Sequence, residues 1–253
     1  MYGKRTVSID GLKIGGNNPV RVESMLKTPL SDLKACLKET EDLATSGCEL
    51  VRVAFPDISL AGNLKKIIEL SSLKIMADIH FNYILAVKAL ELGCRSIRIN
   101  PGNMSNATGI KEIVETAKDT NSVIRIGANA GSLSNSQIKE AKGDRSIALF
   151  NAVEKQLATL LEYNFHDIIL SAKSTDVLDT IRANELLSQK YAYPIHIGIT
   201  EAGEAYSGII KSAVGIGILL SQGIGDTLRV SLTEPPVKEV ECAYHILRTL
   251  HIR

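Results

Sequence analysis

Two kinds of hydrophobic pattern alternate along the chain. Short aliphatic runs recur, and each is followed by a longer segment in which apolar residues return every three or four positions. The short runs predict strands at residues 20–25, 50–55, 74–80, 96–101, 123–129, 167–174, 194–200 and 227–232. The longer segments predict helices at residues 31–46, 60–71, 82–92, 108–120, 146–163, 175–190, 204–222 and 235–250.

Strict alternation of strands and helices predicts an α/β fold with a parallel sheet and right-handed crossovers. Eight such units in 253 residues match the size of a closed (β/α)8 barrel, the TIM barrel, and a doubly wound open sheet is the alternative. Ahead of the barrel, polar and apolar residues alternate around Asp10-Gly11, a strong signal for a β-hairpin. No linker interrupts the pattern. We therefore expect one domain over residues 1–253, with the hairpin within residues 1–18.

Several predicted strands carry a polar or charged residue on one face and aliphatic residues on the other. In a strand, residues i and i+2 share a face, so Arg98 lies with Asn100 and Arg229 with Ser231. Buried parallel strands are normally apolar on both faces, because helices cover both sides of the sheet. The exception repeated in several strands predicts a cationic pocket with an apolar outer wall.

The composition excludes several classes of function. Hydrophobic residues make up 45% of the chain and charged residues 23%, which is typical of soluble globular proteins. The formal net charge of +1 indicates neither nucleic acid nor an anionic membrane as a partner. No apolar run reaches the ~18 residues of a membrane span, and no signal sequence opens the chain, so we expect a cytoplasmic protein.

The chain has four scattered cysteines and no C-x-x-C pair, which predicts reduced thiols and no metal or cluster site; they are Cys36, Cys48, Cys94 and Cys242.

The candidate site lies at the C-terminal ends of the strands, where barrels of this kind carry their active sites. The polar residues there are Arg52, Asp78, His80, Arg98, Asn100, Arg125, Asn129, Lys173, His196, Glu201, Arg229 and Ser231. Five of these are cations, and the opposing charge comes from Asp78 and Glu201, with Glu23 as a further contributor. Burying unpaired cations is costly, so the site predicts an anionic ligand. A phosphate or diphosphate is the simplest, because the guanidinium fork matches its oxygens.

Each residue of this set also has a structural interpretation. A strand arginine or Asp78 could be one half of a buried ion pair, and His80 and His196 could be hydrogen-bonded core histidines. Asp78 and His80, at positions i and i+2, could also contribute to a divalent metal site, although no clear further carboxylate joins them. The convergence of five cations at one end of one barrel favours anion binding.

Seven segments of the chain, in order, match the motifs of one family. They are residues 22–25, 51–56, 77–81, 98–103, 125–133, 198–203 and 223–231. On these motifs the chain resembles the 4-hydroxy-3-methylbut-2-enyl diphosphate synthases over essentially its whole length. That family of oxidoreductases opens methylerythritol cyclodiphosphate with two electrons and loss of water, in the methylerythritol phosphate pathway of isoprenoid (terpenoid) biosynthesis.

The resemblance implies roles for the polar residues at the strand ends. Glu201 is expected closest to the reacting carbons, as the proton donor or the group that directs the loss of water. The residues expected to hold the substrate, largely by its diphosphate, are Arg52, Arg98, Asn100, Arg125, Asn129, Lys173, Arg229 and Ser231. The residues expected to line the same pocket are Asp78, His80 and His196. Glu23 is a departure, because the family commonly has glutamine there.

The resemblance also implies a cofactor and partners. The family's redox centre is a 4Fe-4S iron–sulfur cluster, held by three cysteines and a glutamate in a separate C-terminal domain, and flavodoxin or ferredoxin donates the electrons. None of the four cysteines here matches a ligand position, so we expect residues 1–253 to bind no cluster. In the family's homodimer, the working site forms between the barrel of one subunit and the cluster domain of the other.

We therefore expect a substrate-binding barrel that is inactive without a cluster domain. Two alternatives stay open. One is a cluster-free diphosphate-binding or regulatory protein. The other is a barrel enzyme that acts on another phosphorylated substrate, such as a pterin-type synthase or an aldolase.

Overall fold

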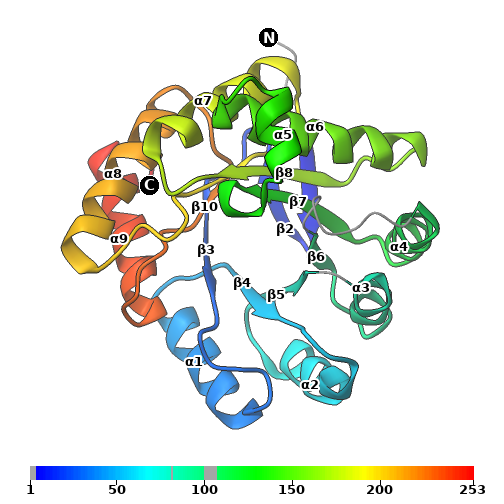
Figure 1. Cartoon of the computed structure of the whole chain (residues 1–253). Helices are drawn as coiled ribbons and strands as arrows, with labels where there is room; N and C mark the ends of the chain where they lie inside the picture. Colours follow the sequence, from blue (N-terminus) through cyan, green and yellow to red (C-terminus); the bar gives the residue numbers. More distant parts are fainter. Residues whose placement is uncertain (1–3, 81, 100–106) are drawn as a thin grey trace.

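The computed structural model describes residues 4–80, 82–99 and 107–253. Eight parallel strands form a barrel, and the helices surround it (Figure 1). The strands are β3 (Arg21–Met25), β4 (Leu50–Ala54), β5 (Lys74–Ile79), β6 (Ser96–Ile99), β7 (Val123–Asn129), β8 (Ile168–Lys173), β9 (His196–Ile197) and β10 (Thr227–Leu228). A parallel bridge between Leu170 of β8 and Ile195, just before β9, closes the sheet. The predicted TIM barrel is confirmed.

The eight predicted helices are also present. They are α1 (Leu33–Thr45), α2 (Ala61–Leu70), α3 (Tyr83–Glu91), α4 (Ala107–Asp119), α6 (Arg145–Glu162), α7 (Val177–Lys190), α8 (Ala205–Ser221) and α9 (Pro236–Thr249). Two short 3-10 helices, η1 (Ile58–Leu60) and η3 (Ala130–Ser132), were not predicted. Neither was α5 (Asn135–Glu140), which is too short to show an apolar period and begins with a capping box between Ser134 and Gln137.

The last two barrel strands are shorter than predicted. Gly198, just after β9, lies close to the backbone that follows β10, and an added Cβ there would be 2.4 Å from the Arg229 carbonyl oxygen. The segments after β9 and β10 are therefore in close contact, although few of their residues pair as strands.

The predicted hairpin consists of β1 (Thr6–Ile9) and β2 (Leu12–Gly15). Asp10 and Gly11 connect them with φ values of 46° and 86°, as the favoured two-residue hairpin turn requires. One face of the hairpin packs on inward-pointing barrel residues, in a cluster made of Val7, Ile9, Ile14, Leu50, Met76, Val123 and Ile169. The hairpin thus covers the barrel end opposite the strand C-termini.

Inward-facing side chains form two layers inside the barrel, a charged layer at the C-terminal end and the apolar layer that the hairpin covers. In β4, Leu50 belongs to the hairpin cluster and Arg52 follows it on the same inward face, while Val51 and Val53 join the main core under the helices. Successive same-face residues are about 6.6 Å apart along a strand. Met76 and Asp78 repeat this order in β5. The polar layer therefore lies at the C-terminal end of the barrel.

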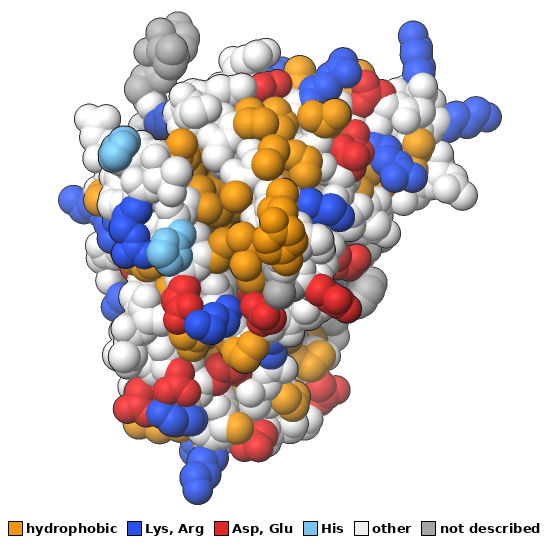
Figure 2. Space-filling view, turned by 90° about the vertical axis from the view of Figure 1, so that its left-hand side faces the viewer, with side chains coloured by type: hydrophobic (Ala, Val, Ile, Leu, Met, Phe, Trp, Pro, Cys, Tyr) orange, Lys and Arg blue, Asp and Glu red, His pale blue; other side chains and the backbone are white. Residues whose placement is uncertain are grey.

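Helix α8 carries an exposed apolar stripe. Its exposed large side chains are Tyr206, Ile209, Ile210, Val214 and Ile218. Figure 2 shows apolar side chains gathered on this side of the molecule. Among the described residues, no helix is both long enough and apolar enough to span a membrane.

Candidate active site

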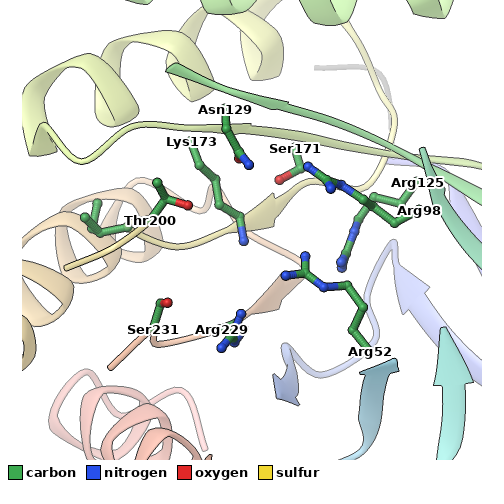
Figure 3. Close-up of a pocket in the computed structure, with 10 residues that line it drawn as sticks. Arg52, Arg98, Arg125, Asn129, Ser171, Lys173, Thr200, Arg229 and Ser231 are labelled. Atoms are coloured by element: carbon green, nitrogen blue, oxygen red, sulfur yellow. The ribbon is translucent and has the colours of Figure 1, made fainter. Parts of the chain in front are cut away.

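A pocket opens at the C-terminal ends of the barrel strands (Figure 3). It encloses about 370 Å³, counting the solvent at its mouth. Side chains from several strands point into it, and seven of the predicted site residues line it: Arg52, Arg98, Arg125, Asn129, Lys173, Arg229 and Ser231. Ser171, Ile199 and Thr200 complete the lining.

Arg125 is held by a buried ion pair with Glu23. Its Nη1 donates to Glu23 Oε2 at 2.5 Å, and both side chains are buried. Burial alone would raise the pKa of Glu23, but Arg125, together with Arg52 and Lys173, holds that pKa below its usual range, so the carboxylate is ionised. Arg125 Nη2 is buried without a hydrogen-bond partner among the described residues. Because Arg125 lines the pocket, the oxygen of a bound anion can accept this hydrogen bond.

Asp78 is the shared counter-ion of two arginines. Arg98 Nη1 donates to its Oδ1 at 3.0 Å across the β5–β6 register, and Arg52 Nε lies 3.3 Å from its Oδ2. His80 Nε2 is 3.5 Å from the same Oδ2. Burial alone would raise the pKa of Asp78, but Arg52, His80 and Arg98 hold it below its usual range. Asp78 thus orients pocket arginines and is not itself among the lining residues.

Lys173 is paired with a neutral group. Its Nζ lies 2.7 Å from Nε2 of the fully buried His196, whose Nδ1 is 3.0 Å from Thr227 Oγ1. Burial, followed by Lys173 and Arg125, holds the pKa of His196 well below its usual range, so the imidazole is neutral. With its proton on Nδ1, toward Thr227, Nε2 can accept from the lysine. Burial and the neighbouring arginines also lower the pKa of Lys173 well below its usual value.

Arg229 has a carboxylate partner that the sequence pattern does not indicate. Glu239, in the first turn of α9, accepts from Arg229 Nε at 3.0 Å and from Nη2 at 3.2 Å, with its own side chain fully buried. An acidic residue in the first turn of a helix usually needs no partner other than the helix dipole, so the sequence pattern drew no attention to it.

The pocket keeps an excess of positive charge among the described residues. Three carboxylates, those of Glu23, Asp78 and Glu239, face four arginines and Lys173, whose protonation adds a fifth positive charge; the arginines are Arg52, Arg98, Arg125 and Arg229. Excess buried cationic charge is costly unless an anion occupies the site. The opposing charge predicted from sequence therefore needs a correction, since Glu239 supplies part of it and Glu201 has no such ion pair among the described residues.

Some predicted residues lie away from the pocket lining. Glu201 follows Thr200, is exposed, and has a φ of 47°. His80 contacts Asp78, and His196 supports Lys173. Asn100 lies outside the described residues. Ser171, which sequence reasoning missed, shares the inward face of β8 with Lys173 two positions later, and this spacing is the signal that could have found it.

The four cysteines are separate, buried thiols. Burial raises the pKa of each, to about 11 for Cys36, about 12 for Cys48 and about 11 for Cys94. Within the described part of the chain, no three His, Cys, Asp or Glu side chains are grouped closely enough to hold a metal ion.

The fold resembles several solved structures. A dihydropteroate synthase from Yersinia pestis has a TM-score of 0.62 at 12% identity, over 97% of this chain and 98% of that one. A type I 3-dehydroquinate dehydratase from Clostridium difficile has a TM-score of 0.68 at 12% identity, over 98% of both chains. Likeness at this level of identity shows the barrel alone.

Sequence relatives give the family. A 4-hydroxy-3-methylbut-2-en-1-yl diphosphate synthase (flavodoxin) from Thermodesulfovibrio yellowstonii is 46% identical over 98% of this chain and 71% of its own length. The relative of the same name from Lawsonia intracellularis is 45% identical, over 98% and 69%. A family model described as the GcpE TIM-barrel domain matches residues 4–244. The resemblance seen in the sequence motifs is thus confirmed, and the chain belongs to the 4-hydroxy-3-methylbut-2-en-1-yl diphosphate synthase family of oxidoreductases through its GcpE TIM-barrel domain.

Proposed function

We propose that this barrel binds 2-C-methyl-D-erythritol 2,4-cyclodiphosphate by its diphosphate, as the substrate-binding part of the enzyme that converts it reductively to 4-hydroxy-3-methylbut-2-enyl diphosphate. The observation that carries this proposal is the pocket in which four arginines and Lys173 face three carboxylates. The relatives' printed name, which contains a diphosphate, supports the same ligand chemistry.

The arginines are held so that each keeps donors for the ligand. A carboxylate engages part of the guanidinium of Arg98, Arg125 and Arg229, and the remaining N–H groups can bind phosphate oxygens. The other proposed donors to the substrate are Arg52, Lys173, Asn129, Ser171, Thr200, Ser231 and Asn100. Asp78, His80 and His196 keep the arginines and the lysine in place.

Glu201 is the proposed catalytic residue. It follows the lining residue Thr200, and its exposed side chain lies on the segment after β9. A carboxylate there can give a proton to a leaving oxygen or direct its loss as water. The backbone at Glu201 is in the left-handed region, a strained conformation that proteins often keep at functional positions.

The reduction needs electrons that these side chains do not supply. The described residues do not fit an iron–sulfur cluster, because the cysteines are dispersed, buried and raised in pKa. We therefore assign the 4Fe-4S cluster of the family to a separate cluster domain, contributed by a second subunit, and the electrons to flavodoxin, as in the relatives' name, or to ferredoxin. The four free thiols favour a reducing, cytoplasmic setting.

The exposed stripe on α8 supports a homodimer. Lys211 is the one charged residue in Ala205–Ser221, so a charged partner surface gains little there. The stripe combines ridges at Ile210 and Val214 with a notch at Gly217, where an added Cβ would meet nothing within 4 Å. A second copy related by two-fold symmetry can set its ridge in this notch, and burial of the apolar side chains then favours association.

The test is a calorimetric titration of the chain with the cyclodiphosphate. Lys173→Met should weaken binding by about 1.5–3 kcal/mol, the value of a hydrogen bond to a charged group. This substitution leaves no carboxylate without its partner, whereas Arg125→Ala would leave Glu23 unpaired. Lys238→Met, which removes an exposed lysine paired with Glu241, is the matched control and should bind like the wild type.

A folded wild-type protein that binds no cyclodiphosphate would contradict the proposal. Equal affinity for inorganic diphosphate and for the cyclodiphosphate would instead favour a general diphosphate-binding protein.

A further inference from the structure

Glu239 is a buried carboxylate of the helix layer that reaches a pocket residue. Oε2 and Oε1 accept from Nε and Nη2 of Arg229, so both bonds engage one edge of the guanidinium. On the other side, Nη1 lies 3.5 Å from Met25 Sδ, a weak acceptor. A phosphate oxygen can take the place of this weak contact. Glu239 therefore fixes the orientation of Arg229 and leaves its free edge for an anion.

The same carboxylate holds the segment that follows Arg229. Glu239 Oε1 accepts from the backbone N–H of Leu232 at 3.1 Å. Lys27 donates to the Leu232 carbonyl oxygen at 2.7 Å, and its Nζ lies 3.4 Å from Glu239 Oε1. Leu232 is thus held at its N–H and at its carbonyl, directly after Ser231, which lines the pocket.

We propose that Glu239 is a positioning residue for anion binding, which acts chiefly through Arg229. The inference rests on the proposed function of the pocket and assigns to α9 a part in it. An arginine side chain loses rotamer freedom when it binds a ligand. A side chain that is already fixed loses less, so prior orientation of Arg229 strengthens binding.

The experiment measures the Kd of inorganic diphosphate by calorimetry for four proteins: wild type, Glu239→Gln, Arg229→Ala and the double variant. Glu239→Gln should raise Kd about tenfold, because the amide nitrogen cannot accept from the arginine. In the Arg229→Ala background the same substitution should raise Kd less than about twofold. Equal losses in both backgrounds would show that Glu239 does not act through Arg229 and would overturn the inference.

Glu49→Gln is the matched control. Glu49 also accepts from an arginine and a backbone N–H, those of Arg21 and Val22, but it lies at the opposite end of the barrel from the pocket. It should lower the melting temperature and leave Kd unchanged. Equal weakening by Glu49→Gln would indicate general destabilisation, which also overturns the inference.

The two proposals fail in different ways. If the wild type does not bind diphosphate, the proposed function is wrong. If the wild type binds and Glu239→Gln binds equally well, only the role of Glu239 is wrong. Should Glu239→Gln not fold, Glu239→Asp tests the same contact, because the shorter side chain cannot keep both hydrogen bonds to Arg229. It should raise Kd about threefold, as the loss of roughly one ordinary hydrogen bond. An unchanged Kd would count against the inference.

Discussion

Lys173 Nζ lies 2.7 Å from His196 Nε2, so the buried lysine of the pocket is supported by a neutral imidazole. The arginines Arg98, Arg125 and Arg229 each contact a carboxylate. An imidazole can accept a hydrogen bond from the lysine but cannot offset its charge. The protonation of Lys173 is therefore the part of the pocket's charge that a bound anion can change most.

Diphosphate binding should be accompanied by proton uptake at Lys173. Burial, together with Arg52 and Arg125, lowers the lysine pKa in the free protein, and a bound anion raises it again. Between these two values the free amine is neutral and the bound one charged, so affinity falls as pH rises through this window. Calorimetry in two buffers of different ionisation enthalpy measures the uptake.

The diphosphate itself also titrates, so the lysine's share is the difference between the wild type and Lys173→Met. Identical proton uptake by both proteins would show that Lys173 does not change its protonation on binding, and would contradict this prediction.

Asp78→Asn should destabilise the barrel by about 3–5 kcal/mol, because it leaves the buried Arg98 and the partly buried Arg52 without their carboxylate. The free energy of unfolding in urea measures the loss. Arg52, His80 and Arg98 hold the folded-state pKa of Asp78 below its usual value. Its contribution is therefore present above about pH 3.9 and lost as the pH falls toward the lower folded-state pKa.

Glu41→Gln provides the comparison for Asp78→Asn. Glu41 is exposed and pairs with Lys38 at 3.6 Å, and its loss should change stability by less than about 0.5 kcal/mol. A similar small change for Asp78→Asn would mean that the two arginines do not depend on this carboxylate.

The barrel could be predicted from sequence because the alternation of residue types within a strand shows which side chains share a face. Arg98 follows this rule, with Ile97 and Ile99 on the opposite face, as does Arg125. Strand periodicity is a local property, and the position of strand ends in a parallel barrel is fixed by the fold. Together they placed seven of the pocket-lining residues without knowledge of any contact.

The ion pairs could not be predicted in the same way, because they join residues of different elements. Glu23 of β3 meets Arg125 of β7 across 102 positions, and Glu239 of α9 meets Arg229 at a separation of only 10 positions. Nothing in the local pattern says which carboxylate turns inward. The placement of His196 beneath Lys173, rather than in the pocket lining, is likewise a matter of packing depth, which periodicity does not give.

Val214→Lys should convert the proposed homodimer into a monomer. The substitution places a charge at the centre of the apolar stripe on α8, where association would bury it. Size-exclusion chromatography with light scattering measures the mass. Leu70→Lys, at an exposed position near the end of α2, makes the same chemical change elsewhere and should leave the mass unchanged. A wild-type protein that is monomeric at tens of micromolar, or a dimeric Val214→Lys, would exclude this interface.

Glu201→Gly should stabilise the chain and remove catalysis. Glu201 has a φ of 47°, which costs an L residue about 1–2 kcal/mol and glycine nothing. The greater freedom of glycine in the unfolded chain takes back about 0.5–1 kcal/mol, so the free energy of unfolding should rise by roughly 0.5–1 kcal/mol. Lys142→Gly, at an exposed position with a φ of 54°, should gain similar stability.

Only the change at Glu201 should abolish turnover, assayed with the cluster domain and reduced flavodoxin supplied, while cyclodiphosphate binding persists. Glu201→Gln separates the charge from the backbone effect, since it should also abolish turnover without the gain in stability. If Glu201→Gln loses binding but keeps its rate at saturating substrate, the carboxylate holds the substrate and does not take part in the chemistry.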